Sequence, residues 1–97
     1  YRGFMATDNS IFIGSKPFMN YVTAVVMQFT TKNADKVIVK GRGKFISRAV
    51  DVSEVVTRRF LSGQVGIEGI KTGSEDFTNA EGRQVRVSTI EITLSKT

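Results

Sequence analysis

Three basic residues alternate with two glycines near the middle of the chain, in the segment Lys40-Gly41-Arg42-Gly43-Lys44. Glycines let the backbone approach a phosphate chain closely, while the side chains of Arg42 and Lys44 can form charge-assisted hydrogen bonds with it. The following helix is predicted to begin near Phe45, so its N-terminal amides would add to the same anion site. The glycine and lysine spacing does not match the phosphate-binding loop of NTPases. The segment predicts a phosphate-binding loop, although basic glycine turns are common elsewhere.

A second basic turn, Ser15-Lys16-Pro17, follows a short apolar run. In an α/β sheet, the loops that leave the C-terminal ends of parallel strands lie along one edge. Lys16 is therefore expected beside the Arg42 loop. Alone, Lys16 would be an ordinary solvated lysine, but next to Arg42 it would belong to a basic ridge.

The net charge of +5 is concentrated in one part of the sequence. Residues 36–60 hold seven basic and two acidic residues, a net charge of +5. Residues 1–35 hold three basic and two acidic residues (+1), and residues 61–97 hold four basic and five acidic residues (−1). Such a concentration favours a polyanionic partner, the alternative being a solvated basic surface.

Histidine and cysteine are both absent from the sequence. Without them, no Ser-His or Cys-His nucleophile and no zinc site of the usual kind can be assembled. The acids are scattered, and their adjacent pair, Glu75-Asp76, is expected in a turn. We therefore predict a protein that is not an enzyme and has no cofactor, metal or small-molecule substrate. No apolar run approaches the ~18 residues of a membrane span, so we expect a cytoplasmic protein.

The first two thirds of the chain read as two strand–helix units. Short apolar runs predict strands over 9–14 and 36–40, and apolar residues at helical spacing predict helices over 18–29 and 46–60, with Pro17 in the first position of the first helix. The first helical stripe comprises Phe18, Tyr21, Val22, Val25, Val26 and Phe29, and the second comprises Ile46, Ala49, Val50, Val56 and Phe60. Val52 and Val55 lie beside the second stripe, where they form either a partner-binding edge or a wider core face.

The last third reads as a hairpin, with strands over 65–70 and 85–95 and a polar, turn-like stretch over 75–84. The apolar positions of the second strand change from odd to even numbers, which predicts a β-bulge near Ser88-Thr89 and a matching irregularity at Gly69. Arg83 and Arg86 would then lie on a projecting tip.

The element order β-α-β-α-β-β predicts a two-layer α/β sandwich, a mixed four-stranded sheet with two helices on one face. We expect residues 1–97 to form one domain, with residues 1–8 as a loosely ordered N-terminus.

Four blocks of the sequence closely resemble the Alba family of archaeal chromatin proteins. In order, they are Ile13–Val22 (IGSKPFMNYV), Val39–Lys44 (VKGRGK), Ile46–Asp51 (ISRAVD), and Gly82–Gln84 (GRQ) with Arg86–Ile92 (RVSTIEI). The resemblance extends from about Asn9 to Lys96. It implies a fold similar to the C-terminal domain of translation initiation factor three, and a homodimer that binds double-stranded DNA, and often RNA, with little sequence preference.

The resemblance also implies roles for individual residues. In such dimers, basic loops form a body over the duplex and the two hairpins act as arms along the minor grooves. Lys16, Arg42 and Lys44 would belong to the body, and Arg83 and Arg86 to the arms. The predicted nucleic-acid contacts are these five residues together with Ser15, Lys40, Gly43 and Arg48. Phe60 would mediate contact between dimers on DNA, unless it is a core residue.

Ser15 departs from the family pattern, which commonly has two lysines before the proline. Acetylation of the first lysine weakens DNA binding in the family, and that switch is impossible at a serine. Lys16 alone would carry this part of the contact, so we predict a weaker salt dependence than in a two-lysine relative.

The resulting hypothesis is a sequence-nonspecific chromatin protein of the nucleoid that coats and compacts DNA through phosphate contacts. One alternative is a dedicated RNA-binding protein, such as an RNA chaperone or a ribonuclease P-type subunit. Another is a small-ligand or protein-interaction domain on the same scaffold, whose binding would be insensitive to salt and to loss of Arg42 and Lys44.

Overall fold

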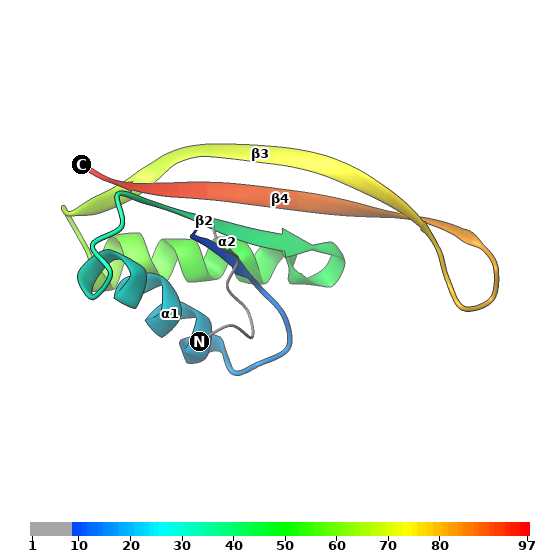
Figure 1. The fold of residues 1–97 in the computed structure, drawn as a ribbon, viewed down its shortest axis with the longest axis horizontal. Coiled ribbons are helices and arrows are strands. Elements are labelled where there is room, and N and C mark those ends of the chain that lie inside the picture. Colours follow the sequence, from blue (N-terminus) through cyan, green and yellow to red (C-terminus); the bar gives the residue numbers. More distant parts are fainter. Residues whose placement is uncertain (1–8) are drawn as a thin grey trace.

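A computed structural model describes residues 9–97, which form a four-stranded mixed sheet covered on one face by two helices (Figure 1). The strands lie in the order β1-β2-β4-β3; β1 pairs with β2 in parallel and the other pairs are antiparallel. The elements are β1 (Ser10–Phe12), α1 (Phe18–Thr30), β2 (Lys36–Arg42), α2 (Ile46–Val55), β3 (Val65–Thr78) and β4 (Gln84–Lys96). The predicted fold class is confirmed. The expectation for residues 1–8 lies outside the described residues.

The core lies between the helices and the central strands. On α1, Tyr21, Val22, Val25 and Phe29 are buried, as the helical spacing predicts. The β-strands contribute alternate residues, because successive side chains of a strand point to opposite faces. The buried strand residues facing the helices include Ile11 of β1, Val37 and Val39 of β2, and Ile90, Ile92 and Leu94 of β4. Within residues 9–97, no helix lies on the other face of the sheet (Figure 1).

The first strand–helix unit differs in detail from the prediction. β1 is shorter than the predicted 9–14, and Pro17 lies one position before α1 rather than in its first turn. Its ψ of 143° is extended, and its carbonyl accepts a hydrogen bond from the Asn20 amide at 3.0 Å. Pro17 therefore caps the helix.

The predicted basic loop is partly strand. Gly41 and Arg42 continue β2 and pair with Ile90 and Thr89, and only Gly43–Phe45 form a turn, the 3-10 element η1. A Cβ atom on Gly41 would lie 2.8 Å from the carbonyl oxygen of Phe45. Gly41 therefore permits close packing of η1 on the sheet, whereas Gly43, with φ of +56°, supplies the backbone conformation of the turn.

The second helix ends earlier than predicted. α2 stops at Val55, and 56–60 form a π-helical turn, η2. Val52 is fully buried and Val55 packs against the core, so these residues widen the core face and do not form a free edge. By contrast, Val50 is 38% exposed, so its predicted place in the core stripe is wrong.

The hairpin is longer and more regular than predicted. β3 continues to Thr78, so Glu75 and Asp76 lie in a strand and not in a turn. The turn is confined to 79–83, where the Asn79 side-chain oxygen accepts hydrogen bonds from the amides of Glu81 (2.9 Å) and Arg83 (3.0 Å).

The expected irregularity occurs at one of its two predicted positions. The register shifts between Ile67 and Gly69 in β3, but pairing is continuous at Ser88 and Thr89, so the bulge predicted there is wrong. The apolar positions of β4 change parity for another reason. Near the core the even-numbered residues are buried under the helices, whereas in the projecting part Val85 and Val87 are half-buried on the opposite face.

Candidate nucleic-acid interface

The two basic loops leave the same edge of the sheet. β1 and β2 are parallel, Phe12 pairs with Lys40, and the Ile13 amide donates a hydrogen bond to the Lys40 carbonyl at 2.8 Å. The segment around Lys16 and the turn η1 therefore both follow the C-terminal ends of neighbouring strands, as predicted.

Arg48 fastens the first loop to α2. Its Nη1 donates a hydrogen bond to the Gly14 carbonyl at 3.0 Å, and its guanidinium lies 5.7 Å from the ring centroid of Tyr21. The Tyr21 hydroxyl in turn accepts a hydrogen bond from the Lys16 amide at 3.0 Å. The side chain of Arg48, predicted as a nucleic-acid contact, is thus engaged in holding Lys16 in position.

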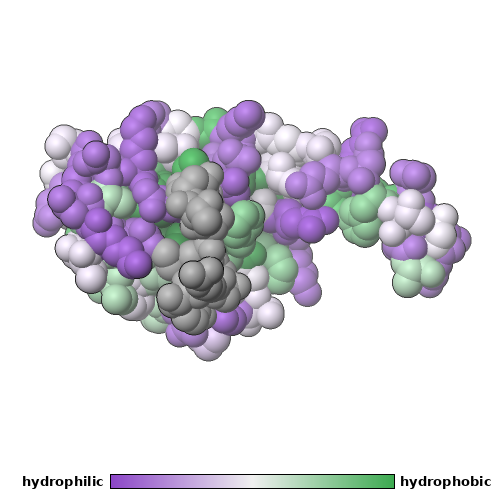
Figure 2. Space-filling model, in the orientation of Figure 1, coloured by the Kyte–Doolittle hydropathy of each residue, from purple (hydrophilic) through white to green (hydrophobic). Residues whose placement is uncertain are grey.

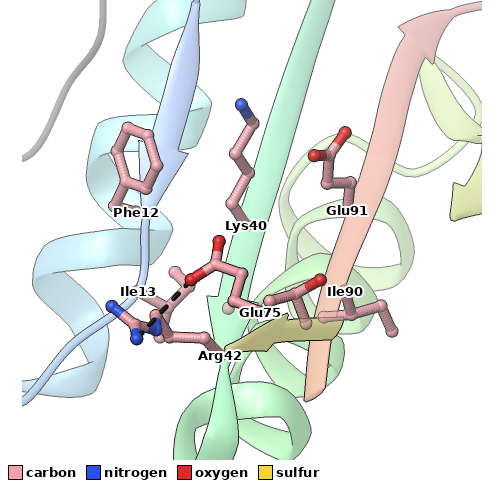
Figure 3. Close-up of a pocket in the computed structure, with 9 residues that line it drawn as sticks. Phe12, Ile13, Lys40, Arg42, Glu75, Ile90 and Glu91 are labelled. Carbon is pink, nitrogen blue, oxygen red and sulfur yellow. Dashed lines mark ion pairs between the residues drawn. The ribbon is translucent and has the colours of Figure 1, made fainter. Parts of the chain in front are cut away.

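The remaining body residues differ in the direction they face. Ser15, Lys16, Gly43 and Lys44 are exposed on the loops. Lys40 and Arg42 are alternate residues of β2 that lie opposite its buried positions, so they project from the helix-free face of the sheet. Figure 3 shows Lys40 standing beside Phe12, with its ammonium 5.3 Å from the ring centroid. Lys40 therefore belongs to the open face rather than to the loop ridge.

Arg42 links the body to the hairpin. Its Nη2 lies 3.5 Å from Oε1 of Glu75 on β3 (Figure 3). Its guanidinium lies 5.5 Å from the ring centroid of Phe77. The two charged side chains are 54% and 57% exposed, so solvent and salt reach this pair. Arg42 can exchange its carboxylate partner for a phosphate.

The hairpin projects from the body as an arm (Figures 1 and 2), hereafter residues 74–88, and the described chain measures 46 × 26 × 22 Å. Arg83 lies in its turn, and Arg86 pairs across the strands with Asp76 at 3.2 Å. Both predicted arm residues are exposed.

Sequence reasoning missed the acidic partners of the interface. Glu75 and Asp76 were expected in a turn, but each lies against an arginine predicted to bind phosphate. Centring the turn on Asn79–Arg83 would have revealed the Asp76–Arg86 pair, because register follows from turn position.

Phe60 ends η2 with half of its side chain exposed (50%), so it is not the core residue of the alternative interpretation. Within residues 9–97, no group of three or more acidic side chains is placed to hold a metal ion. None of the helices there is long and apolar enough to cross a membrane.

Comparisons with known proteins agree on one family. The Alba family profile matches residues 9–74. DNA/RNA-binding protein Alba of Methanococcus maripaludis is 52% identical over 89 residues, covering 92% of this chain and 99% of that protein. The protein of the same name from Nanoarchaeum equitans is 55% identical over 87 residues, covering 89% of this chain and 96% of that protein. The solved structure of Alba from Thermoplasma volcanium superposes with a TM-score of 0.82 at 49% identity, covering 90% of this chain and 99% of that one.

Proposed function

The chain belongs to the Alba family, and from this premise we propose that it is a chromatin protein that binds double-stranded DNA and RNA without sequence preference. In this proposal, residues 1–97 act as one nucleic-acid-binding domain of a homodimer that coats and compacts the chromosome in the cytoplasm. The relatives from Methanococcus maripaludis and Nanoarchaeum equitans are both named as DNA/RNA-binding proteins. The observation that carries the proposal for this chain is the meeting of the Lys16 loop and the Arg42–Lys44 segment at one edge of the sheet.

The mechanism proposed is phosphate neutralisation. Exposed lysine and arginine side chains on two loops and an arm contact the backbone of the nucleic acid and release its condensed counterions. Such contacts position a protein on a duplex without reading bases. We place these contacts at Ser15, Lys16, Lys40, Arg42, Gly43, Lys44, Arg83 and Arg86, with Arg48 supporting the Lys16 loop.

An uncovered apolar surface beside α2 supports the homodimer. Ile67 and Ile70 pair with Leu94 and Ile92, and therefore lie on the helix-facing side of the sheet. Leu94 and Ile92 are at most 1% exposed, whereas Ile67 is 39% and Ile70 is 60% exposed, because α2 packs on β2 and β4. An exposed pair of isoleucines next to the core is suited to burial by a second copy. Phe60, exposed at the end of η2, is proposed to make contacts between dimers on DNA.

The test of DNA binding is the affinity for a random-sequence duplex across a salt series, measured by fluorescence anisotropy. Arg42→Ala/Lys44→Ala is compared with Lys32→Ala/Lys96→Ala. This control removes two positive charges near the start of β2, whereas Arg42 lies at its end: Lys32 precedes β2, and the Lys96 amide donates a hydrogen bond to the Asp35 carbonyl. We expect a steep linear fall of log affinity with log salt, and a shallower slope, by roughly 0.9 per lost phosphate contact, in the first variant only.

A flat salt profile, or equal slopes in both variants, would overturn the proposal and favour the ligand-binding or protein-interaction alternative. Competition between duplex DNA and structured RNA then separates a chromatin protein from a dedicated RNA-binding protein. For the dimer, light scattering of Ile70→Lys should show a monomer, and Met27→Lys, on the exposed face of α1, should leave the mass unchanged. A dimeric Ile70→Lys would place the interface elsewhere.

A further inference from the structure

We propose that the helix-free face of the sheet carries a second binding site, which takes an unpaired nucleotide of a single strand. The site is the pocket of about 210 Å³ lined by Phe12, Lys40, Arg42, Glu75 and Glu91, among others. It rests on the proposed function, because it extends a nucleic-acid-binding surface to a second form of the polymer. It lies on the open face of the sheet, where it shares Lys40 and Arg42 with the proposed duplex contacts and adds the ring of Phe12.

Three strands place three kinds of side chain in one row. Phe12 of β1 pairs with Lys40 of β2, and Lys40 pairs with Glu91 of β4. Residues paired in this way point to the same face of a sheet, and Figure 3 shows the three side chains rising from adjacent strands. The row therefore presents an aromatic ring, a cation and a carboxylate side by side.

Each member of the row has capacity for a ligand. Phe12 is 48% exposed, whereas its neighbour Ile11 is fully buried, so the aromatic ring is open to a ligand. Lys40 and Glu91 face each other across the strands but form no salt bridge in the part of the chain that the structure describes. The pocket can hold several waters, since one water occupies about 30 Å³ of liquid.

This combination fits a nucleotide better than a bare phosphate chain. Two carboxylates, Glu75 and Glu91, offset the two cations of the pocket, so its lining has little net charge to attract a polyanion. A nucleotide can use all three groups. Its base stacks on Phe12, its phosphate reaches Lys40 beside that ring, and an exocyclic amino group of the base donates to Glu91.

The nucleotide must be unpaired. Within a duplex, the faces of each base are covered by its neighbours, whereas single strands can splay a base onto an aromatic side chain. Stacking on Phe12 therefore contributes to the binding of single strands and of loops in RNA, and not to the binding of an intact duplex.

The experiment replaces Phe12 and compares two nucleic acids. Phe12→Leu keeps an apolar side chain in β1 but removes the aromatic ring, and Phe12→Tyr keeps the ring. Fluorescence anisotropy with oligocytidylate should show affinity lower by about 5- to 150-fold for Phe12→Leu, the range measured for loss of one stacked base, and near wild type for Phe12→Tyr. Affinity for a DNA duplex should be unchanged in both. Wild type should also prefer oligocytidylate to oligouridylate, because uracil has no amino group to donate to Glu91.

The matched control is Met27→Ala, which changes a residue with the same 48% exposure on α1 and should alter neither affinity. Equal single-strand affinity in wild type and Phe12→Leu, or an equal loss for duplex, would overturn the inference. Displacement of the oligomer by an equal concentration of free cytidine monophosphate would also overturn the inference. It would show that the site binds mononucleotides and not a strand. Failure of wild type to bind the duplex at all would instead overturn the proposed function, so the two failures are distinguishable.

Discussion

Glu75 is expected to weaken the binding of nucleic acid by occupying Arg42. The two side chains lie 3.5 Å apart and are each more than half exposed, so their pairing contributes no more than about 1 kcal/mol. A phosphate that takes over Arg42 must break this pair. The Glu75→Gln variant removes the competing charge, and about 1 kcal/mol corresponds to an affinity about 5-fold higher.

A double-mutant cycle isolates this contact from the general loss of negative charge. Duplex affinity is measured by anisotropy at one low salt concentration for wild type, Glu75→Gln, Arg42→Gln and the double variant. The gain from Glu75→Gln should appear with Arg42 present and largely vanish with Arg42→Gln. Glu81→Gln changes the same net charge in the arm and has no salt bridge within residues 9–97, so it serves as control. An equal gain with and without Arg42 would refute the competition.

Three further substitutions test other parts of the structure. Ser15→Lys should steepen the slope of log affinity against log salt by roughly 0.9 for each added phosphate contact, and an unchanged slope would place Ser15 outside the interface. Gly41→Ala should lower the free energy of unfolding by about 1–3 kcal/mol in urea titrations, because the added Cβ would lie 2.8 Å from the carbonyl oxygen of Phe45. An unchanged free energy of unfolding would mean that η1 moves away from the sheet without cost. A hydrogen bond from Lys36, and to a lesser extent one from Ser95, lowers the pKa of Glu68. The ionised Glu68 therefore stabilises the fold above the ordinary carboxyl pKa, and this contribution is lost as the pH falls through the lowered pKa. The unfolding temperature of Glu68→Gln should therefore fall less on acidification than the unfolding temperature of wild type.

Residue periodicity predicted the fold because burial follows it closely. The stripe of α1 and the alternate residues of β2 face the same core, and helical and strand spacing place them there. Periodicity failed where side chains leave the core. Val50 and Phe60 continue the apolar spacing of α2 but are exposed, and a pattern does not tell which apolar face a second molecule covers.

The sequence predicted the position of the basic residues of the candidate site but not the position of the acidic ones. Lys16 and the Arg42–Lys44 segment could be placed on one edge because parallel strands end together. The partners Glu75 and Asp76 depend on the length of the hairpin, and polar residues such as Ser74 and Thr78 do not distinguish an exposed strand from a loop. Arg48 was assigned to phosphate because its charge is visible in the sequence, whereas its hydrogen bond to Gly14 depends on tertiary packing.

β4 passes from the interior of the protein into solvent within a single strand. Ile90, Ile92 and Leu94 are buried, whereas 84–88 are exposed or half-buried and, within residues 9–97, pair with β3 alone. A two-stranded ribbon without a core is marginally stable in water, so backbone amides along β4 should span a wide range of hydrogen-exchange rates, slowest near Ile92 and fastest near the turn. The arm of the free protein is then an ensemble in which the hydrogen bonds between β3 and β4 are formed or broken. In the proposed complex, ordering the arm on a duplex carries an entropic cost that a rigid surface would not have.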